Sequence, residues 1–187
     1  YLTNSIDSFS NIFFETMSGY TATGSTILDD VESLPKSIIF WRSMTHWLGG
    51  MGIIVLAIAI LPLLGIGGMQ LFSAEVPGSG ISGDKIHPRI SATAKRLWLI
   101  YFGLTILETI ALSIAGMSFF DAMNHSMSNI ATGGFSTKNE SLAYWNSIPS
   151  VQYIVIFFMI LAGTNYLLIY SAIIGNFKKL FTNTEFL

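Results

Sequence analysis

The sequence contains no cysteine and carries little charge. Only 11% of its 187 residues are Asp, Glu, Lys or Arg, whereas 51% are hydrophobic and the mean hydropathy is +0.59. The absence of cysteine excludes disulfides, thiolate metal sites and thiol catalysis. Soluble domains carry about 25% charged residues, so this composition is typical of a protein embedded in lipid.

Long runs without charge indicate membrane spans. Residues 43–74 and 141–177 contain no charged side chain, and each run exceeds the roughly 20 apolar residues that cross a bilayer. A third apolar run, residues 97–120, is interrupted only by Glu108. We therefore expect three spanning helices. Because the chain starts at Tyr1 without a charged-then-apolar leader, we also expect it to be a piece of a longer protein.

The distribution of charge predicts a topology. Six of the nine basic residues lie in two places, the connector after the first span and the tail after the last: Lys85, Arg89, Lys95, Arg96, Lys178 and Lys179. The positive-inside bias places both segments in the cytoplasm. Seven of the eleven acids then fall outside or near the outer face: Asp7, Glu15, Asp29, Asp30, Glu32, Asp121 and Glu140. The sequence has no run of basic residues of the kind that binds nucleic acid.

An internal repeat runs through the chain. A shift of 110 residues superposes Met17-Ser18 on Met127-Ser128, and Gly24 on Gly134. Before each Met-Ser pair stands a segment of helical character that is too short to cross a bilayer, residues 6–17 and 119–127. A loop of Gly, Thr and Ser follows each short segment.

The flanks of the repeat also agree. After each loop come a polar stretch, a Ser-aliphatic-Pro sequence (residues 33–35 and 147–149) and a long apolar helix with a pair of small residues. The second copy has a span in front of it, so the complete unit is span, short helix, loop and span. The first copy lacks its leading span. We read the chain as residues 1–72 (first unit), 73–95 (cytoplasmic connector, irregular because of Gly and Pro at both ends) and 96–187 (second unit).

A short helix and a loop that return to the side they came from form a re-entrant segment. Irregular backbone at membrane depth is tolerated only where it is buried in protein or lines a water-filled path, since lipid cannot satisfy its N–H and C=O groups. Two such loops therefore imply a shared aqueous route.

The loop residues indicate what would travel along that route. Neither loop contains a charged, His or Cys side chain, so side-chain ligation of a divalent metal is not expected. Glycine permits backbone carbonyls to turn in a row toward an axis, where they replace the hydration shell of a monovalent cation. The partially negative C-terminal end of each short helix would favour a cation over an anion.

These features resemble the first and second pore units of the Trk/Ktr/HKT superfamily of potassium transporters, and most of all its bacterial Trk membrane subunit. The resemblance covers essentially the whole chain and rests on SGYTATGST at residues 18–26, HWLGGMG at 46–52 and ATGGFST at 131–137. It implies an all-α integral membrane fold of repeated helix–pore-loop–helix units, with three spanning and two re-entrant helices. It also implies potassium transport across the cytoplasmic (inner) membrane, by a multi-pass protein without enzymatic activity or cofactor.

The resemblance further implies the site. Gly24 and Gly134 would be the filter glycines, and potassium would bind backbone carbonyls of two loops: Thr21, Ala22, Thr23 and Gly24 in one, and Ala131, Thr132, Gly133 and Gly134 in the other. In this superfamily, a serine in place of the first filter glycine is associated with sodium permeation. Gly24 therefore favours selectivity for potassium.

Partners follow from the same resemblance. Members of the family hold four pore units in one polypeptide, so two units are missing here. Members also assemble as homodimers and, in the bacterial branch, dock on a cytoplasmic ring of nucleotide-binding regulatory subunits. We expect the connector to be the segment of this chain that meets such a ring.

Plainer interpretations stand beside these. Thr-Gly-Ser and Gly-Gly are common in ordinary turns, although two such loops at matching places of a repeat favour the pore. Charged groups are costly within a span and suggest function. We nevertheless expect Arg42 to be structural, either snorkelling outward or paired with an acid such as Glu15 behind the filter. Glu108 would hold a short helix or a neighbouring span.

Three rival functions remain open. A sodium-permeable or sodium-coupled transporter differs only in its filter, and a non-conducting scaffold would carry the same spans. An intramembrane hydrolase would use His46 or His125 with nearby Ser43 or Ser126, but the sequence has no G-x-S-x-G or H-E-x-x-H motif and no paired intramembrane acids.

Overall fold

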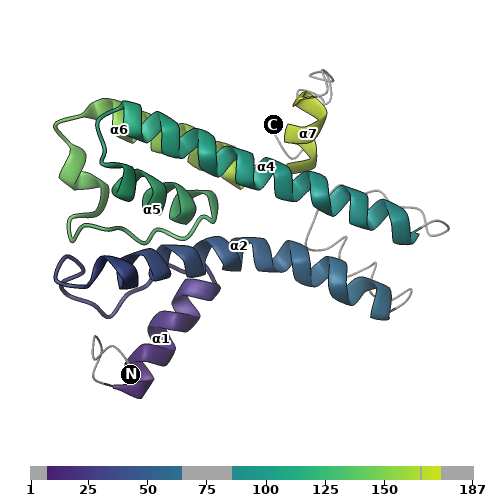
Figure 1. Ribbon diagram of the computed structural model, residues 1–187, viewed down its shortest axis with the longest axis horizontal. Helices are drawn as coiled ribbons and strands as arrows, with labels where there is room; N and C mark the ends of the chain where they lie inside the picture. Colours follow the sequence, from purple (N-terminus) through teal and green to yellow (C-terminus); the bar gives the residue numbers. More distant parts are fainter. Residues whose placement is uncertain (1–7, 65–85, 165, 174–187) are drawn as a thin grey trace. The chain divides into compact units, whose positions relative to one another are not determined.

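The computed structural model describes residues 8–64, 86–164 and 166–173, and this part of the chain is helical, without strands (Figure 1). The α-helices are α1 (Phe9–Tyr20), α2 (Lys36–Leu64), α4 (Ile86–Ile114), α5 (Phe119–Ile130), α6 (Pro149–Gly163) and α7 (Tyr166–Ile173). A short 3-10 helix, η1 (Ser141–Trp145), precedes α6. The chain divides into two compact units, Tyr1–Gly50 with Leu104–Ala162, and Met51–Gly103 with Gly163–Leu187.

Helices α2 and α6 begin where the two Ser-aliphatic-Pro sequences predict. The carbonyl of Pro35 accepts from the backbone N–H of Ile38 at 2.9 Å and starts α2, while Pro149 is itself the first residue of α6. Proline suits this position because its missing N–H would have no partner in the first turn. The uncharged run 141–177 does not form one continuous helix. Helix α6 ends at Gly163, and α7 begins at Tyr166.

The third expected span needs correction at both ends. Helix α4 begins at Ile86, so residues 86–95, which we expected to belong to an irregular connector, are helical. Pro88 does not prevent this, because it lies in the first turn, where backbone N–H groups lack intrahelical partners. The helix ends at Ile114 rather than Phe120, since Gly116 has a φ of +112° and the N–H of Met117 bonds back to Leu112. Residues 73–85 of the connector lie outside the described residues.

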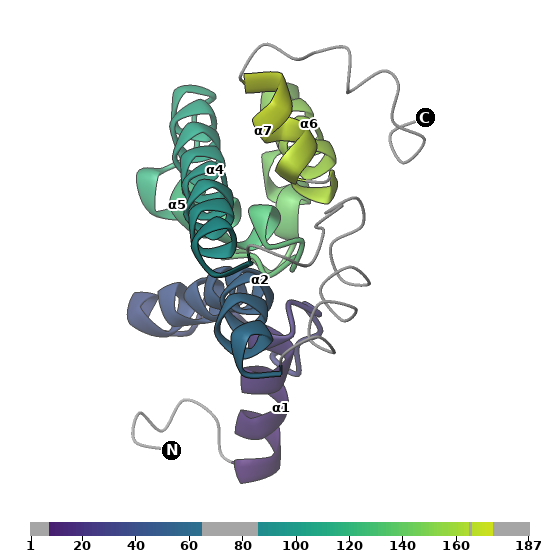
Figure 2. The ribbon, with the colours of Figure 1, turned by 90° about the vertical axis from the view of Figure 1, so that its right-hand side faces the viewer.

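In the first compact unit, α5 lies between α2 and α4 (Figure 1), and Figure 2 shows the same helices turned by 90°. A hydrogen bond of 2.9 Å joins His46 on α2 to Ser128 on α5, and one of 2.6 Å joins Thr109 on α4 to Ser126. An apolar core forms where α4, α5, η1 and α6 meet, from Leu112, Met117, Ala122, Trp145, Val151 and Val155. Helix α5 is therefore held by polar contacts on two sides and by apolar packing near its start.

In the second compact unit, the start of α4 packs against α7 through aromatic rings. The Arg96 guanidinium lies 5.1 Å from the centre of the Tyr170 ring. The rings of Tyr101 and Tyr166 meet edge to face at 6.2 Å.

The outer faces of α4 and α6 are apolar. Large side chains lie exposed along both helices, among them Leu99, Phe102, Leu107, Ile114, Tyr153, Phe157 and Ile160. Ser, Thr, His and Asn side chains are buried in the interior. Exposed apolar area of this extent marks a surface that lipid or other protein covers. Within the described residues, Arg96–Ile114 is long and apolar enough to cross a membrane, and Pro149–Gly163 is apolar but shorter.

Candidate ion-binding loops

The repeat in the sequence is also a repeat of backbone conformation. Helices α1 and α5 each have 12 residues and start 110 positions apart. We name the segments that follow loop 1 (residues 21–26) and loop 2 (residues 131–136). Positive φ angles occur at the same places in both: Ala22 (50°) and Gly24 (76°) in loop 1, Thr132 (56°) and Gly134 (97°) in loop 2.

The same hydrogen bonds fix both turns. The N–H of Thr23 donates to the carbonyl of Ser18 at 3.0 Å, and the N–H of Gly133 donates to the carbonyl of Ser128 at 2.9 Å. These bonds reach from beyond the helix end back into the last turn, as in a Schellman cap. The cap usually has glycine in the left-handed position, where a non-glycine residue costs about 1–3 kcal/mol. Both loops accept that cost, at Ala22 and at Thr132, which identifies them as constrained segments.

The two loops touch each other at their glycines. A Cβ atom on Gly24 would overlap the carbonyl oxygen of Gly133, so only glycine permits this approach. A Cβ atom on Gly134, in contrast, would have no heavy atom within 4 Å in the part of the chain that the structure describes. Gly24 therefore packs against the second loop, whereas Gly134 is open on the side where a Cβ atom would lie.

Hydroxyl groups brace each loop from the helix before it. In loop 1 the Ser18 hydroxyl donates to the carbonyl of Ser25 at 2.6 Å, and the hydroxyl of Thr21 lies 2.8 Å from that of Thr23. In loop 2 the hydroxyl of Ser128 accepts from the N–H of Gly134 at 3.1 Å. The equivalent residues Ser18 and Ser128 thus act as braces. The recurrence of the Met-Ser pair in the sequence is the signal that could have indicated this role.

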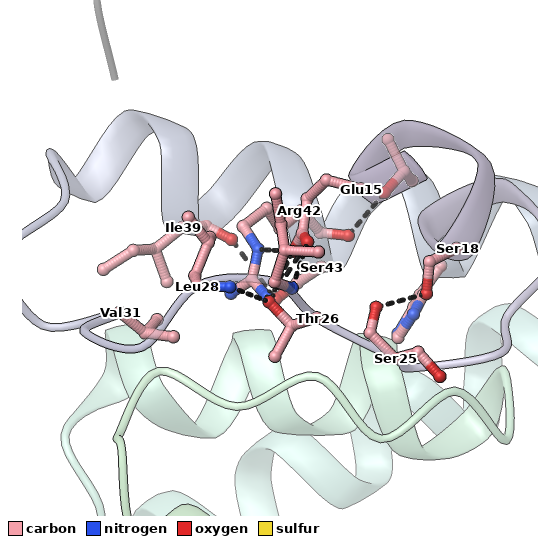
Figure 3. Close-up of polar contacts among 12 residues, drawn as sticks. Glu15, Ser18, Ser25, Thr26, Leu28, Val31, Ile39, Arg42 and Ser43 are labelled. Carbon is pink, nitrogen blue, oxygen red and sulfur yellow. Dashed lines mark hydrogen bonds and ion pairs between the residues drawn. The ribbon is translucent and has the colours of Figure 1, made fainter. Parts of the chain in front are cut away.

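A buried ion pair lies behind loop 1 (Figure 3). The carboxylate of Glu15 accepts from Arg42, with distances of 2.8 Å to Nε and 2.7 Å to Nη2. The Thr26 hydroxyl donates to the same carboxylate at 2.9 Å, and the N–H of Ile27 donates to it at 3.2 Å. Both charged side chains are only 6% exposed. The expected pairing of Arg42 with Glu15 is therefore confirmed, and it ties α1, loop 1 and α2 together.

At the equivalent place in loop 2 a histidine replaces the carboxylate. His125 occupies the place of Glu15 in the second copy and bonds Ser136, the counterpart of Thr26, at 3.0 Å. The other ring nitrogen, Nδ1, donates to the carbonyl of Asp121 at 2.8 Å. Because a carbonyl only accepts, Nδ1 carries the proton, and in the neutral ring Nε2 accepts from the Ser136 hydroxyl.

Glu108 and Asn129 together join three helices. Its side chain on α4 is fully buried, and Oε1 accepts from the side-chain amide of Asn129 on α5 at 2.7 Å. The same amide nitrogen donates to the carbonyl of Val155 on α6 at 3.2 Å. The structure thus places Glu108 where it holds the short helix α5, one of the roles that we expected for it.

The serines that we considered as partners of the two histidines do not hydrogen-bond to them. Ser43 and Ser126 bond the backbone carbonyls of Ile39 and Ala122 and not a histidine. Nε2 of His46 has no hydrogen-bond partner in the described part of the chain, so no carboxylate orients the ring there. The described residues also hold no group of three or more His, Cys, Asp or Glu that fits a metal ion.

A family model described as TrkH, cation transport protein, matches residues 3–186. The chain belongs to the TrkH family. The Trk system potassium uptake protein TrkH of Salmonella typhimurium is 52% identical over 169 residues, which cover 90% of this chain and 35% of that protein. The Trk system potassium uptake protein TrkG of Escherichia coli is 43% identical over 165 residues, 88% of this chain and 34% of that protein.

A solved structure agrees with this membership. The crystal structure of the potassium transporter TrkH from Vibrio parahaemolyticus matches with a TM-score of 0.77 and 40% sequence identity, over 96% of this chain and 35% of that chain. The resemblance found in the sequence is thus confirmed, and the helical fold is that of a membrane transporter. This TrkH-family chain spans about a third of the length of the relatives it matches.

Proposed function

We propose that loops 1 and 2 are two segments of a potassium-selective filter, in a protein that takes up potassium across the cytoplasmic membrane. The observation that carries this proposal is the matched pair of loops, with the same strained backbone and the contact between Gly24 and the Gly133 carbonyl. A chance turn would have no reason to recur at the same offset with the same left-handed residues.

The chemistry of the loops supports a monovalent cation. The carbonyls of residues 21–24 and 131–134 supply oxygen ligands without a fixed charge, which suits an ion that must bind and leave quickly. Helices α1 and α5 end at these loops, and their partially negative C-terminal ends add a favourable potential for a cation. Transport, and not catalysis, is the function that this arrangement serves.

The proposed topology follows the charge distribution. Helices α1 and α5 would be re-entrant, the long helices would span the membrane, and the connector and the C-terminal tail would face the cytoplasm. The remaining filter segments would come from pore units beyond this chain. A homodimer and a cytoplasmic nucleotide-binding ring would complete the assembly, with the connector near the ring.

The test uses the full-length protein in liposomes. We expect uptake of K⁺ and Rb⁺ to exceed that of Na⁺, and we expect this preference to be lost in Gly134→Ser, which changes one carbonyl segment without an obvious clash. Flux without cation preference in the wild type, or an unchanged preference in the variant, would contradict the filter assignment. A wild-type preference for K⁺ over Na⁺ would also distinguish potassium uptake from a sodium-permeable pore. Absence of any flux would favour a non-conducting scaffold.

A further inference from the structure

Arg42 contacts both loops. Its Nη2 atom donates to the hydroxyl of Thr26 in loop 1 at 3.1 Å, in addition to the ion pair with Glu15. The same guanidinium lies 4.1 Å from the centre of the Phe135 ring, and Phe135 directly follows Gly134 in loop 2. A cation over an aromatic face is attracted to it, more strongly where water is excluded.

A second contact between α2 and loop 2 lies one turn further along the helix. The ring of His46 stacks on the ring of Phe135, with centres 3.9 Å apart and planes 12° from parallel. His46 also bonds Ser128, and a Cβ atom on Gly133 would overlap its ring. Loop 2 thus rests on two side chains of the first copy, four positions apart on one face of α2.

This arrangement is not repeated in the second copy. Alignment of the two Ser-aliphatic-Pro sequences, Ser33 with Ser147, places Ile156 at the position of Arg42. Ile156 is 48% exposed, whereas Arg42 and Phe135 are buried. The guanidinium that joins two loops is therefore a particular feature of the first copy and not a general requirement of the repeated fold.

We propose that Arg42 is a positioning residue that fixes loop 1 and loop 2 relative to each other, and that it thereby sets the preference for K⁺ over Na⁺. The proposal rests on the proposed function. Phe135 is covalently next to Gly134, and Gly24 lies against the Gly133 carbonyl, so a shift at either end of the Arg42 contacts displaces carbonyls in both loops. A carbonyl filter discriminates ions of similar charge through the placement of these oxygens.

A double-mutant cycle tests the coupling. Glu15→Gln removes the charge that holds Arg42 on the loop 1 side, and Phe135→Leu removes the aromatic face on the loop 2 side. In the full-length protein in liposomes, we expect each variant to lower the K⁺/Na⁺ flux ratio about three-fold or more. Because both act through Arg42, the double variant should lower the ratio by less than the product of the two single effects. A double effect equal to that product would overturn the coupling.

Arg42→Lys separates positioning from simple charge balance. Lysine keeps the positive charge beside Glu15 but lacks the planar fork that pairs with a carboxylate and stacks on a ring. We expect this variant to fold and to carry K⁺ with a reduced K⁺/Na⁺ ratio. A wild-type ratio in Arg42→Lys would mean that the residue only neutralises Glu15, which would overturn the proposal.

Glu32→Gln is the matched control. It breaks the ion pair of 3.0 Å between Glu32 and Lys138, which also joins the segments after the two loops but is more exposed than the pair of Arg42 and Glu15 and does not involve Arg42. We expect its flux ratio to equal that of the wild type. If wild-type flux is selective and Gly134→Ser abolishes the selectivity, while the Arg42, Glu15 and Phe135 variants keep it, this inference fails and the proposed function stands. If the wild type itself is unselective, the proposed function fails.

Discussion

Loops 1 and 2 share their backbone but differ in what holds them. Both turns are closed by the same hydrogen bonds and place a non-glycine residue and a glycine at positive φ. At the position of Glu15, loop 1 is held by a buried ion pair with Arg42, whereas at the equivalent position of loop 2 His125 forms a hydrogen bond with Ser136. The comparison indicates that the loop shape is the constrained property, and that chemically different supports can maintain it.

The largest expected difference between the copies concerns the two glycines. In Gly24→Ala, the new methyl group would overlap the Gly133 carbonyl and would also occupy a left-handed backbone, so both loops must shift. In Gly134→Ala the space is open and the φ of +97° remains the only obstacle. We expect Gly24→Ala to lower K⁺ flux about ten-fold more than Gly134→Ala, which corresponds to about 1.4 kcal/mol, because the overlap with the Gly133 carbonyl adds to the left-handed strain that both variants share.

Flux of K⁺ and Na⁺ by the two variants, normalised to the folded protein in the liposomes, checks this order. Equal effects would mean that the contact between the loops is not important for conduction. A larger effect of Gly134→Ala would indicate that the open side of loop 2 is filled more tightly in the full-length protein.

The supports should differ in their contribution to stability. Glu15→Ala leaves the guanidinium of Arg42 buried without its partner, and loss of one member of a buried pair costs about 3–5 kcal/mol. In His125→Ala the Ser136 hydroxyl and the Asp121 carbonyl each lose a neutral hydrogen bond, at about 1–3 kcal/mol for a buried group left unsatisfied. Thermal unfolding of the detergent-solubilised full-length protein should therefore show the larger drop in Tm for Glu15→Ala. Glu140→Ala, an exposed carboxyl at the start of η1, is the control and should leave Tm unchanged. Similar drops for both variants would show that the charge adds nothing to the first copy.

Much of this comparison could be predicted from the sequence. The offset of 110 residues, the helix starts after Ser-aliphatic-Pro and the pairing of Glu15 with Arg42 all follow from local pattern and from the cost of an unpaired charge in lipid. The contact of Arg42 with Phe135 could not be predicted, because it depends on how α2 packs against a loop more than 90 residues later. The early start of α4 also differs from the prediction, because Pro88 suggests irregular structure but proline is tolerated in the first turn of a helix.

The segments after the two loops meet in a polar cluster, and it should give the smallest effect. Asn139 accepts from the N–H of Val31 at 2.7 Å and donates to the carboxylate of Asp30 at 2.9 Å. Hydrogen bonds, first of all the one from Asn139, hold the pKa of Asp30 below its ordinary value of 3.8. A depressed pKa means that the charged form is favoured in the fold, so this contribution to stability is present above pH 3.8 and is lost as pH falls through the lowered pKa.

Asp30→Asn keeps the shape of the side chain and removes its titration. We expect the wild type to have a slightly higher Tm than this variant at neutral pH, and we expect the difference to shrink as pH falls below 3.8. The carboxylate bonds neutral donors, so added salt should leave the difference unchanged, whereas salt should weaken the neighbouring pair of Lys138 and Glu32. A difference in Tm that persists at the acid end of the titration would exclude Asp30 ionisation as its source. A difference that disappears in salt would assign the cluster's stability to the ion pair instead.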